Sequence, residues 1–321
     1  MIPIFVAAFD GVLLLDLAGI AEPFRLANVW AANQRMPAPF DVRFVGPKST
    51  ARTSLGISLG GLAELPSAID PAAWIVVPGA TRATNHAGTA ARALVPWMRR
   101  VGPAAARRIT VCSGALLAGR AGWLDGRECT THHDLIEALR DAAPAAKVIE
   151  NRIFVADGAL ATSAGITAGI DLALWVIGEV VGPIGALAVA RDMVMFARRT
   201  GADPQVSSWL VHRNHLHPAI HRVQDAIAQA PAERWSVSRM ASAAHVGERH
   251  LTRLFQAHAG VTPLVYLQRI RLAVARSLLS DPGASVESAA AAAGFTSAHQ
   301  LRRAWRRDAG TTPRGGVAIT R

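Results

Sequence analysis

Short runs of consecutive apolar residues alternate with longer segments of helical spacing through the first two hundred residues. The apolar runs that predict strands are Ile2–Phe9, Phe40–Val45, Trp74–Val77, Ile109–Val111, Arg152–Val155 and Ala159–Thr162. The segments that predict helices are Leu15–Trp30, Ala90–Val101, Ala115–Ala121, Thr167–Val180 and Pro183–Arg198. Strands of this kind, alternating with helices, predict a mostly parallel sheet covered on both faces. Ligands of such sheets bind at the carboxyl ends of the strands.

The last hundred residues have helical spacing throughout, and one pattern occurs there twice, fifty residues apart. The matched residues are Leu251 and Leu301, Arg253 and Arg303, Phe255 and Trp305, Ala259-Gly260 and Ala309-Gly310, and Thr262-Pro263 and Thr312-Pro313. Both copies predict a helix with apolar residues on one side and basic residues on the other. A short helix, a turn and a basic helix outline a helix-turn-helix, so two copies predict contact with two successive major-groove segments of DNA. The second copy alone would fit a solvated charged helix equally well.

The remaining boundaries of this region follow from caps and turns. We expect helices at Pro218–Gln229, from Ser236 or Ser238 to Ala244, at Glu248–His258 and at Pro263–Leu279, with the second copy beginning at Ser285-Val286. Gly294 breaks the run before the second basic helix, Asp281-Pro282-Gly283 ends the long helix, and Gly310 ends the last one. The apolar residues of the long helix that we expect to pack against both copies are Leu264, Leu267, Ile270, Val274 and Leu278.

Charge is concentrated in the same region. The net charge is +11, with 15 Lys and Arg against 7 Asp and Glu from residue 201 onward and 19 against 16 before it. This is the electrostatic footprint that binding to nucleic-acid phosphates requires. Only two cysteines occur, and the N-terminus has no signal-peptide pattern. Asp171, Glu179 and several glycines interrupt the apolar region 159–190, so we expect no membrane span, and we expect a soluble protein in the reducing cytoplasm.

Cys112 stands where a buried strand turns sharply into a helix. Gly114 lets this turn close, and the helix N-terminus favours a thiolate. His132, in Thr130-Thr131-His132-His133, offers an imidazole that could activate the thiol. A small buried hydrophobe is the equally weighted alternative for Cys112.

The motifs of this half resemble the PfpI/ThiJ superfamily, which has the class-I glutamine-amidotransferase-like fold. They are Asp16-Leu17-Ala18-Gly19, Glu22-Pro23-Phe24, Val77-Pro78-Gly79, Cys112-Ser113-Gly114-Ala115, Ala121-Gly122-Trp123-Leu124-Asp125-Gly126, Thr130-Thr131-His132 and Thr162-Ser163-Ala164-Gly165 with Asp171. The resemblance covers residues 1–198 and implies an α/β domain with a flavodoxin-like parallel-sheet sandwich. It also implies an elbow cysteine at Cys112 with His132 and Asp16 as partners. Val111 departs from the pattern, because many catalytic members have a small residue there.

Enzymes of this superfamily are hydrolases, hydratases or glyoxalases, whereas members fused to a DNA-binding domain more often use the pocket for an effector. The resemblance therefore implies an effector pocket, and the residues we assign to it are Asp16, Glu22, Cys112, Ser113, His132 and Ser163. We assign no catalytic residue to the regulator; Cys112, His132 and Asp16 are a vestigial catalytic set, or the catalytic set if the chain is instead an enzyme.

A linker is expected at residues 199–217, since Gly201 and Pro204 interrupt the pattern there. Four histidines follow closely: His212, His215, His217 and His221. His217 and His221 have the i,i+4 spacing of metal ligands, but no acid or cysteine is interleaved. We therefore expect neither a metal nor a cofactor, and a DNA-binding domain at residues 218–321.

The repeated pattern resembles the AraC/XylS DNA-binding domain over residues 218–316, through Gly294-Phe295-x-Ser297 and the Gly-x-Thr-Pro ends. With the first domain, the chain resembles the GlxA-type regulators of the AraC family. The predicted base-reading residues are Arg249, His250, Arg253, His299, Gln300 and Arg303. The predicted phosphate-binding residues are Arg302, Arg306 and Arg307.

The resemblance implies a homodimeric transcription regulator that binds double-stranded DNA and a small effector. In similar regulators the effector is often a nitrogenous metabolite such as an amino acid or betaine. Two alternatives remain open: a Cys112-dependent hydrolase or hydratase that the basic domain localises, and a redox sensor acting through Cys112.

Overall fold

The computed structural model divides the chain into two compact units, Met1–Gln205 and Val206–Arg321. It describes residues 1–81, 89–195, 199–201, 203–205, 211–213, 215–279, 283–309 and 312–313. The predicted boundary at Arg198, the helix end at Asp281-Pro282 and the terminal Gly310 lie outside the described residues.

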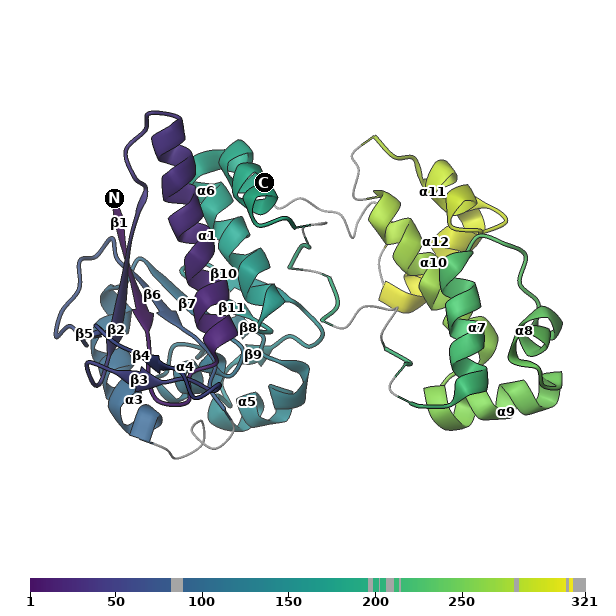
Figure 1. Ribbon diagram of the computed structural model, residues 1–321, viewed down its shortest axis with the longest axis horizontal. Coiled ribbons are helices and arrows are strands. Elements are labelled where there is room, and N and C mark those ends of the chain that lie inside the picture. The colour runs from purple at the N-terminus through teal and green to yellow at the C-terminus, as the bar shows by residue number, and fades with distance from the viewer. Residues whose placement is uncertain are drawn as a thin grey trace. The chain divides into compact units, whose positions relative to one another are not determined.

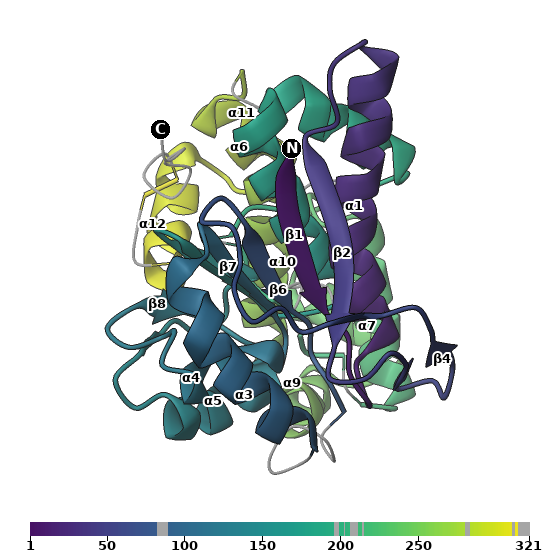
Figure 2. The ribbon, with the colours of Figure 1, turned by 90° about the vertical axis from the view of Figure 1, so that its left-hand side faces the viewer.

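A seven-stranded sheet forms the centre of the first unit, in the order β10-β11-β7-β6-β1-β2-β5 (Figures 1 and 2). Its strands are β1 (Ile2–Ala7), β2 (Phe40–Gly46), β5 (Ala63–Glu64), β6 (Trp74–Val77), β7 (Arg107–Val111), β10 (Phe154–Asp157) and β11 (Leu160–Ser163). All neighbouring pairs are parallel except β10 and β11. Two short pairs lie outside the sheet: β3 (Ala51–Arg52) with β4 (Ser58–Leu59), and β8 (Glu128–Cys129) with β9 (Lys147–Val148). The predicted mostly parallel sheet is confirmed.

Helices cover both faces of this sheet (Figures 1 and 2). They are α1 (Leu14–Asn33), α3 (Thr89–Val101), α4 (Gly114–Arg120), α5 (Ile136–Ala142) and α6 (Thr167–Asp192), with 3₁₀ turns at Gly102–Ala104 and His133–Leu135. α1 and α6 pack side by side, while α3 and α4 lie across the sheet from them. The loops after β1, β6, β7 and β11 meet at one edge, where ligands of parallel sheets bind.

α6 differs from the expectation in two respects. The two predicted helices form one element with a kink at Gly182, whose φ of 80° is outside the helical range, and it ends at Asp192. The expected absence of a membrane-length apolar span is wrong by length and composition, because the most apolar stretch of α6 has a mean hydropathy of 2.0. We interpret α6 as a core helix, since apolar residues on more than one side of it, such as Leu172, Leu174 and Ile177, are buried.

The second unit is helical in its described residues (Figure 1). Its helices are α7 (Pro218–Gln229), α8 (Val237–Ala244), α9 (Glu248–Ala259), α10 (Pro263–Leu279), α11 (Val286–Ala292) and α12 (Ala298–Ala309). Two separate cores hold it together. One, around Leu251 and Phe255, joins α7 to the first half of α10, and the other, around Leu301 and Trp305, joins the second half of α10 to α11 and α12. α10 is therefore the element shared by two helix-turn-helix units.

The apolar set predicted for α10 is partly wrong. Leu267 and Ile270 are buried, and Val274 is half-buried against the second core, but Leu264 and Leu278 are 49% and 38% exposed. Tyr266, Leu272, Ala275 and Leu279 are buried instead. A helix that contacts two cores in succession buries one face along its first half and a rotated face along its second, which a single stripe does not describe.

The repeat is visible in the caps. Ser236 accepts the backbone N–H of Arg239, which confirms it as the predicted cap, and Ser285 forms a capping box with Ser288. These caps lie 49 residues apart, as do the left-handed turn residues His245 and Gly294. The spacing of fifty applies from α9 and α12 onward, so the second turn has one additional residue.

Candidate nucleic-acid interface and ligand site

Cys112 occupies a strained elbow at the end of β7. Its φ of 52° lies in the left-handed region, which non-glycine residues rarely adopt. A Cβ at Gly114 would lie 2.1 Å from the carbonyl oxygen of Val77, so only glycine allows α4 to begin this close to β6. Gly165 is equally constrained, because a Cβ there would lie 2.9 Å from the Cys112 Sγ. Closely packed backbone therefore holds the cysteine in place.

Three of the predicted pocket residues meet around Gly79, at the end of β6. A Cβ at Gly79 would lie 2.5 Å from Asp16 Oδ2, 2.9 Å from Cys112 Cβ and 3.1 Å from Ser113 Oγ. Asp16 is buried and accepts backbone N–H groups from Gly79 (3.2 Å) and Ile166 (2.8 Å). The structure thus brings together loops that follow β1, β6, β7 and β11.

The electrostatics of this site disfavour a thiolate. Burial raises the pKa of Asp16, and the two backbone N–H groups only partly oppose that shift. Burial and then the negative charge of Asp16 raise the pKa of Cys112 to about 12, against a smaller lowering by the N–H of Ser113. The predicted effect of the α4 N-terminus is therefore outweighed, because desolvation dominates.

The other predicted pocket residues lie differently. Ser113 is buried and its hydroxyl is bound to the backbone of Ala80 at 2.8 and 3.1 Å. His132 accepts the N–H of Asp134 through Nδ1 at 3.3 Å and stacks on His133, and it is neighbouring Thr131 that donates to the Cys112 carbonyl, at 2.8 Å.

Two pocket assignments need revision. Glu22 lies on the exposed side of α1, paired with Arg25, because six residues of helix turn it away from Asp16. Ser163 contributes its carbonyl to the Cys112 N–H (2.9 Å), while its buried hydroxyl lies beside Gly169 of α6. Thr131 was not predicted to contact Cys112, and its place in the Thr130-Thr131-His132 motif was the one feature of the sequence that pointed to it.

The described residues of the predicted linker are bound to the unit in which they lie. Arg199 binds buried Asp171 through its backbone N–H (3.1 Å) and Nε (2.8 Å), and Gln205 donates to the carbonyls of Thr131 (2.8 Å) and Arg152 (3.0 Å). His212 donates to the carbonyl of Ala259 in the second unit at 2.7 Å.

The i,i+4 spacing of His217 and His221 does not bring their two rings together, because each lies against a different histidine. His215 lies 4.6 Å from His221, and His217 lies 4.8 Å from His258, measured between ring centroids. His132, His133 and Asp134 form a separate group whose possible ligand atoms all lie within 4.8 Å of one another. That group is largely exposed, and nothing else about it indicates an ion.

The outward faces of α9 and α12 carry matching basic residues. On α9, Arg249 and Arg253 are exposed opposite the buried Leu251 and Phe255. On α12, His299, Arg303 and Arg306 are exposed opposite the buried Leu301 and Trp305. The exposed and buried sides of both helices are those that the helical spacing of the sequence predicts, at 100° per residue.

Four predicted DNA-binding side chains already have partners within the second unit, and two of them, His250 and Arg253, are partners of each other. His250 contacts Arg253 at 3.0 Å. The Gln300 Oε1 accepts from the Thr296 N–H (2.8 Å) and hydroxyl (3.0 Å), which closes the turn before α12. Arg302 pairs with Glu287 of α11 at 2.8 Å.

Comparisons with known proteins match each half of the chain. Residues 29–179 match the DJ-1/PfpI family model and residues 240–315 a helix-turn-helix domain model. The HTH-type transcriptional regulator GlxA of Rhizobium meliloti (strain 1021) is 32% identical over 94% of this chain and 90% of its own length. Isonitrile hydratase of Pseudomonas putida is 48% identical, but over only 25% of this chain and 34% of its own length.

Among solved structures, a THiJ/PfpI family protein from Pseudomonas syringae shares the fold with a TM-score of 0.54 at 22% identity, covering 71% of this chain and 86% of that one. The match to GlxA spans both the region of the DJ-1/PfpI model and that of the helix-turn-helix model. The chain therefore belongs to the GlxA-type regulators of the AraC family, which join a DJ-1/PfpI domain to an AraC-type helix-turn-helix domain.

Proposed function

We propose that this DNA-binding transcription regulator reads two successive major-groove segments of promoter DNA, one with α9 and one with α12. The observation that carries the proposal is the pair of helix-turn-helix units, each with its own core, built on the shared helix α10. Both units expose an arginine at the same place, Arg253 and Arg303, beside a second basic or imidazole group. Two reading helices on one rigid element favour two half-sites at a fixed spacing.

Each exposed side chain is assigned the contact that its chemistry allows. Arg253 and Arg303 can each bind guanine O6 and N7 with two hydrogen bonds, and Arg249 and His299 stand one turn earlier on the same faces. Arg306 and Arg307, nearer the end of α12, suit phosphates. Gln300 and Arg302 have to exchange their present partners for DNA, so we expect smaller contributions from them, and His250 and Arg253 have to release their contact with each other.

Operator selection tests this proposal. Full-length protein would be incubated with random duplexes, and the dissociation constants for the selected duplex and a scrambled one compared at fixed salt. The double variant Arg253→Ala, Arg303→Ala should lose the preference for the selected duplex. The matched control removes two exposed arginines of the first unit, Arg35 and Arg92, and should retain it. Equal binding of the wild-type protein to both duplexes would refute the proposal.

We further propose that the site around Asp16, Cys112 and Ser113 binds the effector. Support comes from its place at the carboxyl ends of β6 and β7 and from the buried carboxyl of Asp16 without a cation partner among the described residues. A buried carboxyl suits a cationic or amine-bearing ligand, in accord with a nitrogenous effector. A thermal-shift screen should find such a ligand, and Asp16→Asn should abolish the shift, because ligand binding to the native state raises its stability.

An apolar surface on the second segment of α6 supports a homodimer. Ile184 and Leu187, one turn apart, are 78% and 54% exposed, and Val194 beyond the end of the helix is 88% exposed. Exposed apolar residues gathered on one helix are typical of an interface. Ile184→Glu should convert the dimer to a monomer in analytical ultracentrifugation, whereas the same change at exposed Leu55 should not.

The two free cysteines and the DNA partner are in accord with a cytoplasmic protein.

Catalysis by Cys112 is the second candidate, favoured by the elbow geometry and the local match to isonitrile hydratase. The raised pKa of Cys112 counts against it, since the thiolate is the nucleophile. We therefore propose that the chain is not an enzyme. Cysteine-dependent turnover of an isonitrile, lost in Cys112→Ala with DNA binding intact, would overturn this.

A further inference from the structure

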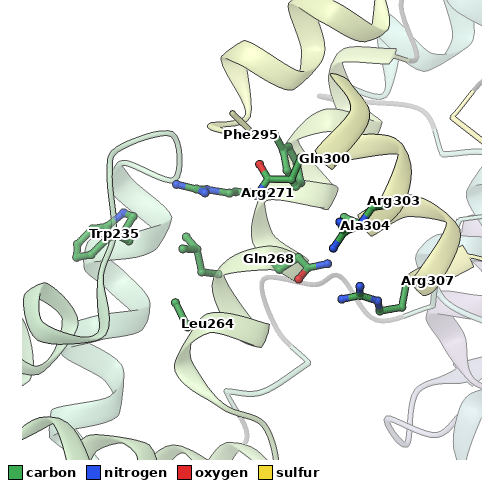
Figure 3. A pocket seen from close by; sticks show the side chains of 10 residues that line it. Trp235, Leu264, Gln268, Arg271, Phe295, Gln300, Arg303, Ala304 and Arg307 are labelled. Carbon is green, nitrogen blue, oxygen red and sulfur yellow. The ribbon is translucent and has the colours of Figure 1, made fainter. Parts of the chain in front are cut away.

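A pocket of about 270 Å³ lies between the two helix-turn-helix units of the second domain (Figure 3). Trp235, before α8, and Phe295, before α12, contribute apolar walls. Arg303 and Arg307 extend from α12 toward Gln268 on α10, and Arg271 extends from α10 toward the segment that carries Trp235 (Figure 3). The pocket therefore has an apolar base and a strongly polar side.

The charge of this pocket is uncompensated. Three arginines are among the ten residues that line it, and none of the ten is acidic. Arg271 is fixed by donating through Nε to the carbonyl of Pro231 (2.9 Å) and through Nη2 to that of Glu233 (2.7 Å). Within the described residues, the side chains of Arg303 and Arg307 have neither a hydrogen bond nor an ion pair. Arg303 and Arg307 both extend toward Gln268, with no acid among the lining residues, and this arrangement matches an anion that accepts several hydrogen bonds, of which phosphate is the best example.

The position of Arg303 indicates which way the pocket opens. On α12, Arg303 stands in the middle of the exposed face with His299 and Arg306, and it also lines the pocket. Arg307 is rotated toward the pocket side. The pocket therefore opens beside the face of α12 that is assigned to DNA. A duplex read by both helices presents a stretch of backbone between the two major-groove segments, and that stretch adjoins the segment read by α12.

We propose that this pocket binds a phosphodiester group of the DNA backbone between the two half-sites. This inference rests on the proposed function and assigns DNA contacts to Gln268 and Arg271, which belong to neither reading helix. Because α10 joins both units, a phosphate held there fixes the register of the whole domain on the duplex. The contact positions the protein without reading a base.

The test introduces a negative charge into the pocket without removing an arginine. Gln268→Glu in the full-length protein should weaken binding to the selected operator by about tenfold or more and lower the slope of log Kd against log salt concentration by about 0.9, the effect of one lost phosphate contact. The matched control, Gln229→Glu at an exposed position of α7, should change both quantities much less. Thermal melting checks that both variants are folded.

Neutral methylphosphonates, placed one at a time between the half-sites, locate the phosphate. One of them should weaken binding of the wild-type protein but leave binding of Gln268→Glu unchanged. Equal losses in both proteins at every position, with operator binding intact, would overturn the pocket assignment alone. Stabilisation of the DNA-free wild-type protein by inorganic phosphate that is lost in Gln268→Glu, with no coupling to the duplex, would assign the pocket to a free phosphate compound and also overturn it. A wild-type chain that selects no operator would overturn the proposed function together with this inference.

Discussion

Cys112 should react with alkylating reagents far more slowly than an ordinary cysteine. Its pKa of about 12, against an ordinary 9.0, leaves about a thousandfold less thiolate near neutral pH. A more basic thiolate is a better nucleophile, and with a Brønsted coefficient of about 0.4–0.5 this recovers a factor of roughly 20. The net expectation is a reaction roughly 30- to 60-fold slower, before any loss of access through burial.

The assay is iodoacetamide alkylation followed site by site by mass spectrometry, with the protein in concentrated denaturant as the reference. Asp16→Asn should speed alkylation of Cys112, because removing the carboxylate charge lowers the pKa of the thiol. Cys129 is an internal control, since burial alone raises its pKa to about 11. Its rate should be the same in both proteins.

Rapid alkylation of Cys112 in the native wild-type protein, with a midpoint below its ordinary pKa, would refute this reasoning. It would show that the helix N-terminus or a neighbouring imidazole outweighs burial, and the enzyme and redox-sensor hypotheses would then gain support. An unchanged Cys112 rate in Asp16→Asn would show that the charge of Asp16 has no part in the shift.

Three further predictions concern stability. Phe255→Ala should lower the free energy of unfolding of the second unit by about 3–5 kcal/mol in urea titrations, since Phe255 is fully buried; a loss under about 1 kcal/mol would mean that its core is not packed as described. Gly114→Ala should prevent stable folding of the first unit, because the new Cβ meets the carbonyl of Val77; a normal melting curve would contradict the close approach of α4 to β6. Burial and then its histidine neighbours lower the pKa of His215, so the folded state binds this proton less readily than the unfolded chain does. Stability should be complete above the ordinary pKa of 6.5 and fall as the pH drops through the lowered value, and His215→Gln should flatten that dependence in thermal melts.

The sequence predicted features that depend on periodicity and on local caps. The strand runs and the faces of α9 and α12 are of this kind, since burial there follows from position along one element. The sequence-based predictions were wrong where packing against a second element decides whether a side chain is buried. Leu264 is exposed because α10 contacts two cores in turn, and Glu22 is exposed because the rotation of α1 allows only Asp16 to face Gly79.

Charge and pairing were harder to predict for the same reason. The thiolate-favouring helix N-terminus at Cys112 is a local feature, whereas the burial that opposes it depends on Gly79 and Gly165 from other loops. The pocket around Arg271 had no signal in the sequence, because its walls come from segments sixty residues apart along a helical repeat.

The central claim is that one chain reads two half-sites with two matched helices. The most direct measurement is operator selection repeated with Arg253→Ala and with Arg303→Ala as separate variants. Each variant should lose its preference at one half-site only, by about 1–3 kcal/mol at the affected position, and the two affected half-sites should be one helical turn of DNA apart. Loss of preference at the same bases in both variants, or no change in either, would contradict the account.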